Sequence, residues 1–226
     1  MILASILVSA FVVFIELPLH EYAHAVTAYK CGDDTPKLAG GLTLNPIAHI
    51  DLMGAILIVL TGFGWAKPTP VNPYNYKNPR RDNILVSLAG PVSNLLLGWL
   101  FCFLTVAVTH MGSFPATNGG VLVTDILYIA GQISVFLAVV NLLPIPMFDG
   151  FAVLESFLPQ KAVYWIQTHQ GMLSMIILLL FLTGAFSIPL MWLSGWFLKF
   201  FLSLAELTFT GIWAMPAGLQ SIVLFL

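Results

Sequence analysis

Long apolar stretches alternate with short polar segments along the chain, and their lengths predict membrane-spanning helices. A helix needs about 20 predominantly apolar residues to cross the hydrocarbon core of a bilayer. Four stretches approach or exceed this length: Met1 to about Val26, Ile84 to Thr109, Ile126 to Phe148, and about Val163 to Phe186. The pattern therefore predicts an all-α, polytopic membrane protein with about four to six transmembrane helices.

The region between the first two predicted spans contains two shorter features. The apolar run from Leu52 to Phe63 is too short to span a bilayer and predicts a re-entrant or interfacial segment. Before it, Gly40 to Asn45 has turn glycines followed by alternating apolar and polar residues, which is typical of a short strand. We therefore expect a short β-hairpin or re-entrant segment here, on the cytoplasmic side.

Beyond Phe186 the pattern is less regular. The segment from Ile188 to Leu207 is apolar but is interrupted by Pro189 and Lys199, so one further span and interfacial helices both fit. We treat residues 1–226 as a single integral membrane domain, with a core at 1–155 and peripheral helices at 160–226.

Composition supports a membrane protein and excludes one class of partner. The 226 residues are 59% hydrophobic and only 8% charged, whereas soluble domains carry about 25% charged residues. The net charge of −2 argues against a nucleic-acid partner, which normally requires a clustered basic face. This composition therefore predicts a protein embedded in a lipid bilayer.

The basic residues also predict an orientation. Six of the eight Lys and Arg residues lie between residues 30 and 81, and the loop from His110 to Thr124 has none. By the positive-inside rule, the 30–81 region is cytoplasmic. If Leu52 to Phe63 does not cross, the third span returns residues 148–150 to the leaflet of the first helix. We expect a cell (inner, cytoplasmic) membrane protein whose active site opens to the cytoplasm.

The sequence His20-Glu21-Tyr22-Ala23-His24 lies at the end of the first apolar stretch. Residues four apart share one face of a helix, so both imidazoles can reach one Zn²⁺, with Glu21 beside it as the base. His20 precedes Lys30 by ten residues, which places it roughly 15 Å inside the cytoplasmic boundary at 1.5 Å per residue. This pattern predicts a metal site within the hydrocarbon layer.

Asp149 is the candidate for a third ligand. It follows two prolines, Pro144 and Pro146, at the end of the third predicted span, and no Lys or Arg lies near it in the sequence. An ionisable residue at membrane depth is a functional hypothesis by default. Two histidines and a carboxylate leave the fourth position of a zinc ion for water. We therefore expect one Zn²⁺ per chain.

Five motifs together resemble the site-2 protease family of intramembrane zinc metalloproteases. They occur in the family's order between residues 14 and 155, in a compact form without PDZ or nucleotide-sensing domains. The motifs are His20-Glu21-x-x-His24, Gly41-x-x-x-Asn45-Pro46, Gly64-Trp65-Ala66-Lys67-Pro68-x-Pro70-Val71-Asn72-Pro73, Gly90-Pro91-x-x-Asn94 and Asn141-x-x-Pro144-x-Pro146-x-x-Asp149-Gly150.

The resemblance implies a role for several residues. It implies His20, His24 and Asp149 as zinc ligands, Glu21 as the general base, and Asn141 as a stabiliser of the tetrahedral oxyanion. It also implies that the substrates are transmembrane segments of other proteins. The sequence leaves the oligomeric state open.

Three further residues are candidates for substrate binding, each with a structural alternative. Gly41 lies in the predicted strand, whose edge could bind an unwound substrate. Asn45 could orient substrate backbone or stabilise the turn before Pro46. Asn94 could contact substrate or hold membrane helices together by hydrogen bonds.

Two other functions use similar residues. A membrane metal-ion transporter could coordinate a cation with buried His and Asp, but it should show polar residues along a whole path, whereas the second and third spans are nearly uncharged. A catalytically inactive scaffold that only binds substrates has no need of Glu21. Both stay as alternatives to a protease.

Overall fold

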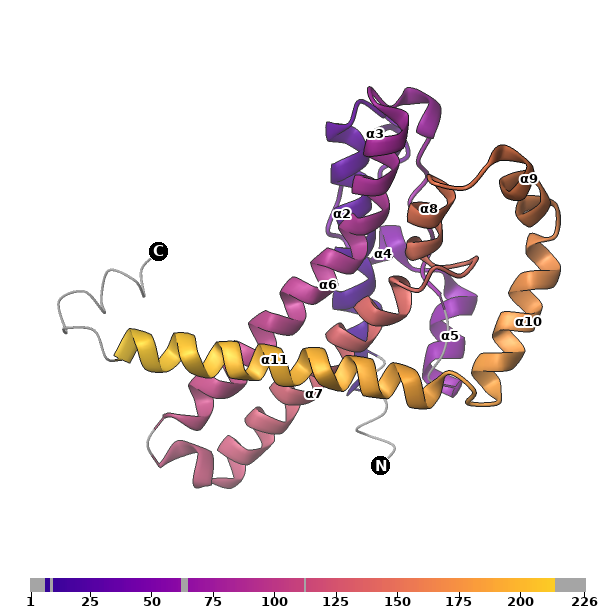
Figure 1. The fold of residues 1–226 in the computed structure, drawn as a ribbon. Coiled ribbons are helices and arrows are strands. Elements are labelled where there is room, and N and C mark those ends of the chain that lie inside the picture. The colour runs from indigo at the N-terminus through magenta and orange to yellow at the C-terminus, as the bar shows by residue number, and fades with distance from the viewer. Residues whose placement is uncertain (1–6, 9, 62–64, 112, 214–226) are drawn as a thin grey trace. The chain divides into compact units, whose positions relative to one another are not determined.

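The computed structural model describes residues 7–8, 10–61, 65–111 and 113–213, and every regular element among them is helical (Figure 1). In chain order the elements are η1 (Val12–Glu16, a π-helical turn), α2 (Leu17–Lys30), α3 (Thr35–Leu38), α4 (Pro46–His49), α5 (Leu52–Thr61), η2 (Pro73–Asn75), α6 (Pro79–Thr109), η3 (Phe114–Ala116), α7 (Asn118–Asn141), α8 (Asp149–Glu155), α9 (Gln160–Thr168), α10 (Gln170–Leu182) and α11 (Ser187–Trp213).

The chain divides into two compact units. One comprises Met1–Asn94 and Phe136–Leu190, and the other comprises Leu95–Val135 and Met191–Leu226. The division falls within α6, α7 and α11, so each of these three helices contributes residues to both units. All of the candidate site residues named from the sequence belong to the first unit.

Within the residues that the structure describes, three helices are long and apolar enough to cross a membrane: α6, α7 and the Ser187–Gly211 part of α11. Helices α9 and α10 pass the same test as a pair, bent by 71°, and would make a fourth span. This count agrees with the expected four to six spans only at its lower end. The first expected span falls partly outside the described residues, but from Val12 to Lys30 the chain is helical.

The ends of α6 and α7 show how local polar groups set the length of a span. Helix α6 begins at Pro79, before the expected Ile84, because Asp82 accepts a hydrogen bond from the Asn78 backbone N–H at 2.8 Å. Helix α7 begins at Asn118 and not at the expected Ile126, since the Thr117 hydroxyl accepts a bond from the Gly120 N–H at 3.0 Å. Side-chain acceptors of this kind satisfy the first amides of a helix.

The span expected from about Val163 to Phe186 corresponds to two helices, α9 and α10, with a bend at His169. The His169 ring stacks on Trp165 and its Nδ1 lies 2.8 Å from the Trp165 carbonyl oxygen. Local bonds of this type compete with the regular helical pattern. Beyond Phe186, where one further span and interfacial helices both fitted the sequence, the structure has one uninterrupted helix, α11. This helix tolerates Pro189 because the residue lies in its first turn.

The β-hairpin expected near Gly40 to Asn45 is wrong, since the described residues contain no β-strand. Gly40 adopts a positive φ of 76°, and the chain then follows local bonds. The Thr43 hydroxyl accepts from the Asn45 N–H at 3.1 Å, and the Asn45 side chain caps α4 by accepting from the Ile47 N–H at 3.1 Å. His49 Nε2 donates to the Thr43 carbonyl at 2.7 Å. These bonds occupy the groups that a strand would have offered to a partner.

Candidate metal centre

Helix α2 presents two buried imidazoles to one point. His20 and His24 lie one turn apart, are 6% and 8% exposed, and bring their Nε2 atoms to 3.1 Å. The ring centroids are 4.7 Å apart and the rings meet nearly edge-on, at 77°. Nitrogen atoms that converge in this way suit a shared cation.

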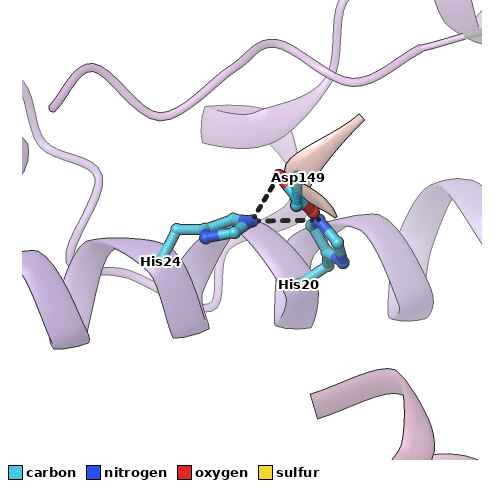
Figure 2. Close-up of side chains that lie close together, drawn as sticks. All are labelled: His20, His24 and Asp149. Atoms are coloured by element: carbon cyan, nitrogen blue, oxygen red, sulfur yellow. Dashed lines mark hydrogen bonds and ion pairs between the residues drawn. The ribbon is translucent and has the colours of Figure 1, made fainter. Parts of the chain in front are cut away.

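A carboxylate from α8 reaches the same point, as Figure 2 shows. Asp149 Oδ2 lies 3.1 Å from His20 Nε2, and Oδ1 lies 3.4 Å from His24 Nε2. The three ligand atoms all lie within 4.8 Å of one another. Two imidazoles and one carboxylate are a donor set of catalytic zinc sites, so the residues present fit a zinc ion.

A tight turn after α7 delivers Asp149 to this position. The backbone of Met147 adopts a positive φ of 99°, which is uncommon for a residue with a side chain. Phe148 is extended and precedes the first turn of α8, where Asp149 is the first residue. At Gly150 an added Cβ would overlap the Leu142 carbonyl, so only glycine allows this close approach. The Asp-Gly pair thus begins the helix and permits the turn that aims its carboxylate.

Helix α6 holds His24 through its backbone. His24 Nδ1 donates to the Val86 carbonyl oxygen at 2.7 Å, a bond across 62 residues of sequence. A proton fixed on Nδ1 leaves the lone pair of Nε2 directed toward Asp149 and His20. The Val86 carbonyl therefore orients one imidazole for metal binding.

One turn further along α6, Gly90 packs directly against both imidazoles. A Cβ at this position would overlap the Nε2 atoms of His20 and His24. Any side chain here would occupy the space in which the two nitrogen atoms meet Asp149. The glycine is therefore needed to keep the coordination space open.

Asn83, on the same stretch of α6, holds the helix that carries Asp149. Its side-chain amide donates to the Ala152 carbonyl and to the Ser156 hydroxyl, each at 3.1 Å. Both acceptors belong to α8 or to its C-terminal end. Asn83 thus fixes α8 relative to α6.

Glu21 follows His20 on α2 and is half-buried. Its Oε2 accepts a hydrogen bond from the Thr69 backbone N–H at 2.7 Å, and the Thr69 hydroxyl donates to the Glu21 carbonyl oxygen at 3.1 Å. The carboxylate is therefore held by a segment 48 residues away in sequence.

The remaining candidates lie in other surroundings. The Asn141 amide donates to the Leu137 carbonyl of its own helix at 3.0 Å. Asn94 is buried within α6 at 2% exposure, Asn45 caps α4, and the Gly41 N–H donates to the Pro36 carbonyl at 2.8 Å. The structure brings His20, His24 and Asp149 together, and it engages these four residues in local contacts.

Sequence reasoning missed the roles of Thr69, Asn83, Val86 and Gly90. Thr69 and Gly90 lie in two of the quoted motifs, but a motif does not say what its members touch. Val86 acts through a backbone carbonyl, for which a sequence carries no signal. Asn83 could have been noted as a polar residue near the start of a span.

Comparisons with known proteins identify a family of similar proteins. The model of peptidase family M50 matches residues 111–183. YwhC of Bacillus subtilis, named as a candidate zinc metalloprotease, is 45% identical over 145 residues, which cover 64% of this chain and 66% of that protein. Rip2 of Mycolicibacterium smegmatis, named in the same way, is 32% identical over 189 residues, covering 81% of this chain and 70% of that protein.

An archaeal protein is also similar. MJ0611 of Methanocaldococcus jannaschii, again named as a candidate zinc metalloprotease, is 34% identical over 109 residues, covering 46% of this chain and 50% of that protein. No solved structure matches the chain. The matched part of the chain spans about two thirds of YwhC and Rip2. On these matches, the chain belongs to peptidase family M50, the site-2 protease family of intramembrane zinc metalloproteases.

Proposed function

We propose that the chain hydrolyses peptide bonds within or near transmembrane segments of other membrane proteins, with one Zn²⁺ held by His20, His24 and Asp149. The observation that carries the proposal is the convergence of these three side chains from two distant helices. Membership of family M50 supports a protease and does not favour a metal transporter or an inactive scaffold.

The chemistry follows from the donor set and its neighbours. A zinc ion, when bound, polarises the scissile carbonyl and lowers the pKa of water. Glu21 takes the proton from the attacking water and passes it to the leaving amine. The Val86 carbonyl keeps the His24 proton on Nδ1, so His24 offers Nε2 throughout the cycle.

Asn141 is proposed as the stabiliser of the tetrahedral oxyanion. Its amide donates to the Leu137 carbonyl, so this role requires the side chain to exchange that bond for the substrate oxygen. Amide donors aimed at a developing charge contribute strongly to acyl-transfer reactions. Asn141→Ala should therefore lower kcat while the zinc content is unchanged.

The substrate reaches the site from within the membrane. A helical peptide bond is shielded by its own hydrogen bonds, so the substrate must unwind locally before hydrolysis. The distribution of Lys and Arg supports a site that opens to the cytoplasm and a location in the cell membrane. For Asn45, the cap on α4 favours the structural alternative over substrate binding.

The proposal is tested with purified protein in detergent and a single-pass transmembrane substrate. Glu21→Gln should abolish cleavage and retain one zinc per chain, because the base is lost and the ligands stay. Glu155→Gln is the matched control, since the Glu155 carboxylate accepts a hydrogen bond from the exposed Gln167 amide, and it should cleave normally. Unchanged turnover in Glu21→Gln would contradict the mechanism.

A separate measurement tests the ligands. Zinc content should fall to background in a double variant, His20→Ala with Asp149→Ala, and stoichiometric zinc in that protein would refute the assigned site. Natural substrates can then be sought by comparing the membrane proteomes of cells that carry the wild type or Glu21→Gln. Single-pass proteins that accumulate only with Glu21→Gln are the expected substrates.

A further inference from the structure

An extended segment at residues 67–72 lies against the helices of the site and is held by three backbone N–H groups. Lys67 donates to the His49 carbonyl at 2.9 Å, Thr69 to Glu21 Oε2 at 2.7 Å, and Asn72 to Asp33 Oδ2 at 2.7 Å. The segment forms neither helix nor strand. Three of its four backbone N–H groups thus donate to other parts of the first unit.

The middle contact differs from the other two because its acceptor is the proposed base. Thr69 binds Glu21 twice, through the N–H to the carboxylate and through the hydroxyl to the backbone carbonyl. A hydrogen bond to an ionised carboxylate is short and strong compared with one between neutral groups. With Oε2 held in this way, Oε1 is the oxygen left to exchange a proton with water.

The segment is stiff where it meets Glu21. Thr69 stands between Pro68 and Pro70, and each proline ring fixes its backbone φ near −65°. Neither proline can donate a hydrogen bond, so the Thr69 N–H is flanked by two residues without competing donors. This backbone is therefore suited to presenting one N–H in one direction.

Asp33 anchors the C-terminal end of the segment. It is fully buried, and besides the Asn72 N–H it accepts from the Thr35 N–H at 3.0 Å, from the Thr35 hydroxyl, and from the Asn75 amide at 2.8 Å. A buried carboxylate with this many donors is held rigidly. The segment is consequently ordered by groups outside the metal site.

We propose that Thr69 is a positioning residue for Glu21: its N–H fixes the carboxylate in the orientation in which the base takes a proton from water. The inference rests on the proposed function, because it requires Glu21 to be the base. The relevant group is the backbone N–H, and the Thr69 hydroxyl serves only to hold the segment on α2.

Three variants of Thr69 separate these groups. Thr69→Pro removes both the N–H and the hydroxyl, Thr69→Val removes the hydroxyl alone, and Thr69→Ser keeps both. General-base catalysis contributes on the order of 10²–10⁴-fold, and we expect Thr69→Pro to lose about 10–100-fold in kcat, with KM and zinc content unchanged. Thr69→Val should stay within about threefold of the wild type and Thr69→Ser should match it, since both retain the N–H.

A backbone ester at Thr69 gives the same test without the geometry of proline. Replacing the residue by its α-hydroxy analogue removes only the N–H, and the same fall in kcat is expected. Wild-type kcat in the ester protein would overturn the inference. A raised KM with unchanged kcat would overturn it as well, because the segment would then bind substrate and not position the base. In either case the proposed function would stand, provided that Glu21→Gln is inactive.

Discussion

The two halves of α6 make different kinds of contact: the first half supports the candidate metal site, and the second half packs against other helices. In the first half, Asn83, Val86 and Gly90 follow one another at helical spacing and contact α8, His24 and both imidazoles. In the second half, which belongs to the other unit, aromatic side chains pack together. Trp99 stacks on Phe103 with ring centroids 5.8 Å apart, and Phe103 meets Phe209.

The difference between the two halves of α6 is clearest at two glycines, Gly90 in the first half and Gly98 in the second, each at a close contact. A Cβ at Gly90 would overlap the ligand nitrogen atoms, whereas a Cβ at Gly98 would approach a methyl group of Val135 to 2.7 Å. The first glycine leaves room for chemistry, and the second allows one helix to pack against another. The same residue type in one helix therefore has a functional role in one half and a packing role in the other.

The largest expected effect comes from exchanging these glycines for alanine. Gly90→Ala should lose zinc and at least about 10²-fold in activity, because small misplacements in an active site cost that much. Gly98→Ala should keep its zinc and lose about 1–3 kcal/mol of stability through overpacking. Metal analysis and thermal unfolding in detergent measure the two effects. A Gly90→Ala protein that still contains one zinc per chain would contradict the role given to Gly90.

A second, smaller effect is expected from Asn83, which holds α8. Asn83→Ala removes two hydrogen bonds that fix the helix of Asp149, and we expect zinc affinity to fall about 10-fold, as for residues that orient metal ligands. Ser87→Ala is the control on the same face, since the Ser87 hydroxyl donates to the Asn83 carbonyl of its own helix. Competition with a zinc chelator compares the two variants, and equal affinities would count against this role.

The third effect is expected from Asp33, a buried carboxylate in the loop that follows α2 in the first unit. Burial raises the pKa of Asp33, but the bonds from Thr35, Asn72 and Asn75 outweigh burial and hold the pKa below its ordinary value. Since the unfolded chain binds the proton more readily, the stabilisation is fully present above the ordinary pKa of about 3.9 and is lost as the pH falls through the lower folded value.

Thermal unfolding of the wild type should therefore lose stability steeply below about pH 4, and Asp33→Asn should show a shallower acid slope. Between pH 5 and 8, Asp33 should add no pH dependence to either protein, because it stays ionised there in the folded and the unfolded chain. Identical slopes at acid pH would show that the carboxylate does not hold the loop.

The smallest effect is expected in the second unit. His110 Nε2 lies 3.2 Å from Glu206 Oε1, and both side chains are partly exposed, at 37% and 49%. Exposed ion pairs contribute about 0–1 kcal/mol, so Glu206→Gln should leave zinc content and cleavage unchanged and shift stability by less than about 1 kcal/mol. A loss of activity here would mean that side chains of the second unit also contribute to the reaction.

The three side chains of the candidate metal centre could be named from the sequence because two of them give a local signal. His20 and His24 are four residues apart, and the helix brings their imidazoles to one face whatever the rest of the fold does. Asp149 required one long-range step, the return of the third span to the same leaflet, and the structure places its carboxylate against both imidazoles. The supporting contacts could not be named, because Thr69 meets Glu21 and Val86 meets His24 across 48 and 62 residues.

The failed strand at Gly40 to Asn45 has a related cause. Alternation of apolar and polar residues describes which side a residue faces, but a strand also needs a neighbour to accept its hydrogen bonds. The residues that the structure describes offer no such neighbour, and the polar side chains of Thr43 and Asn45 bind the adjacent backbone. Similarly, the bend at His169 depends on side-chain bonds to preceding carbonyls, which hydrophobic spacing does not report.

The separation of the metal ligands along the chain has a consequence for biosynthesis. Asp149 is added 125 residues after His24, so at about 5–20 residues per second a ribosome makes it roughly 6–25 s later. During that interval a nascent chain carries only two of the three candidate ligands. If His20, His24 and Asp149 bind zinc as proposed, the centre cannot be complete until α8 has been made, and a newly inserted first helix would then be unable to cut its neighbours in the membrane.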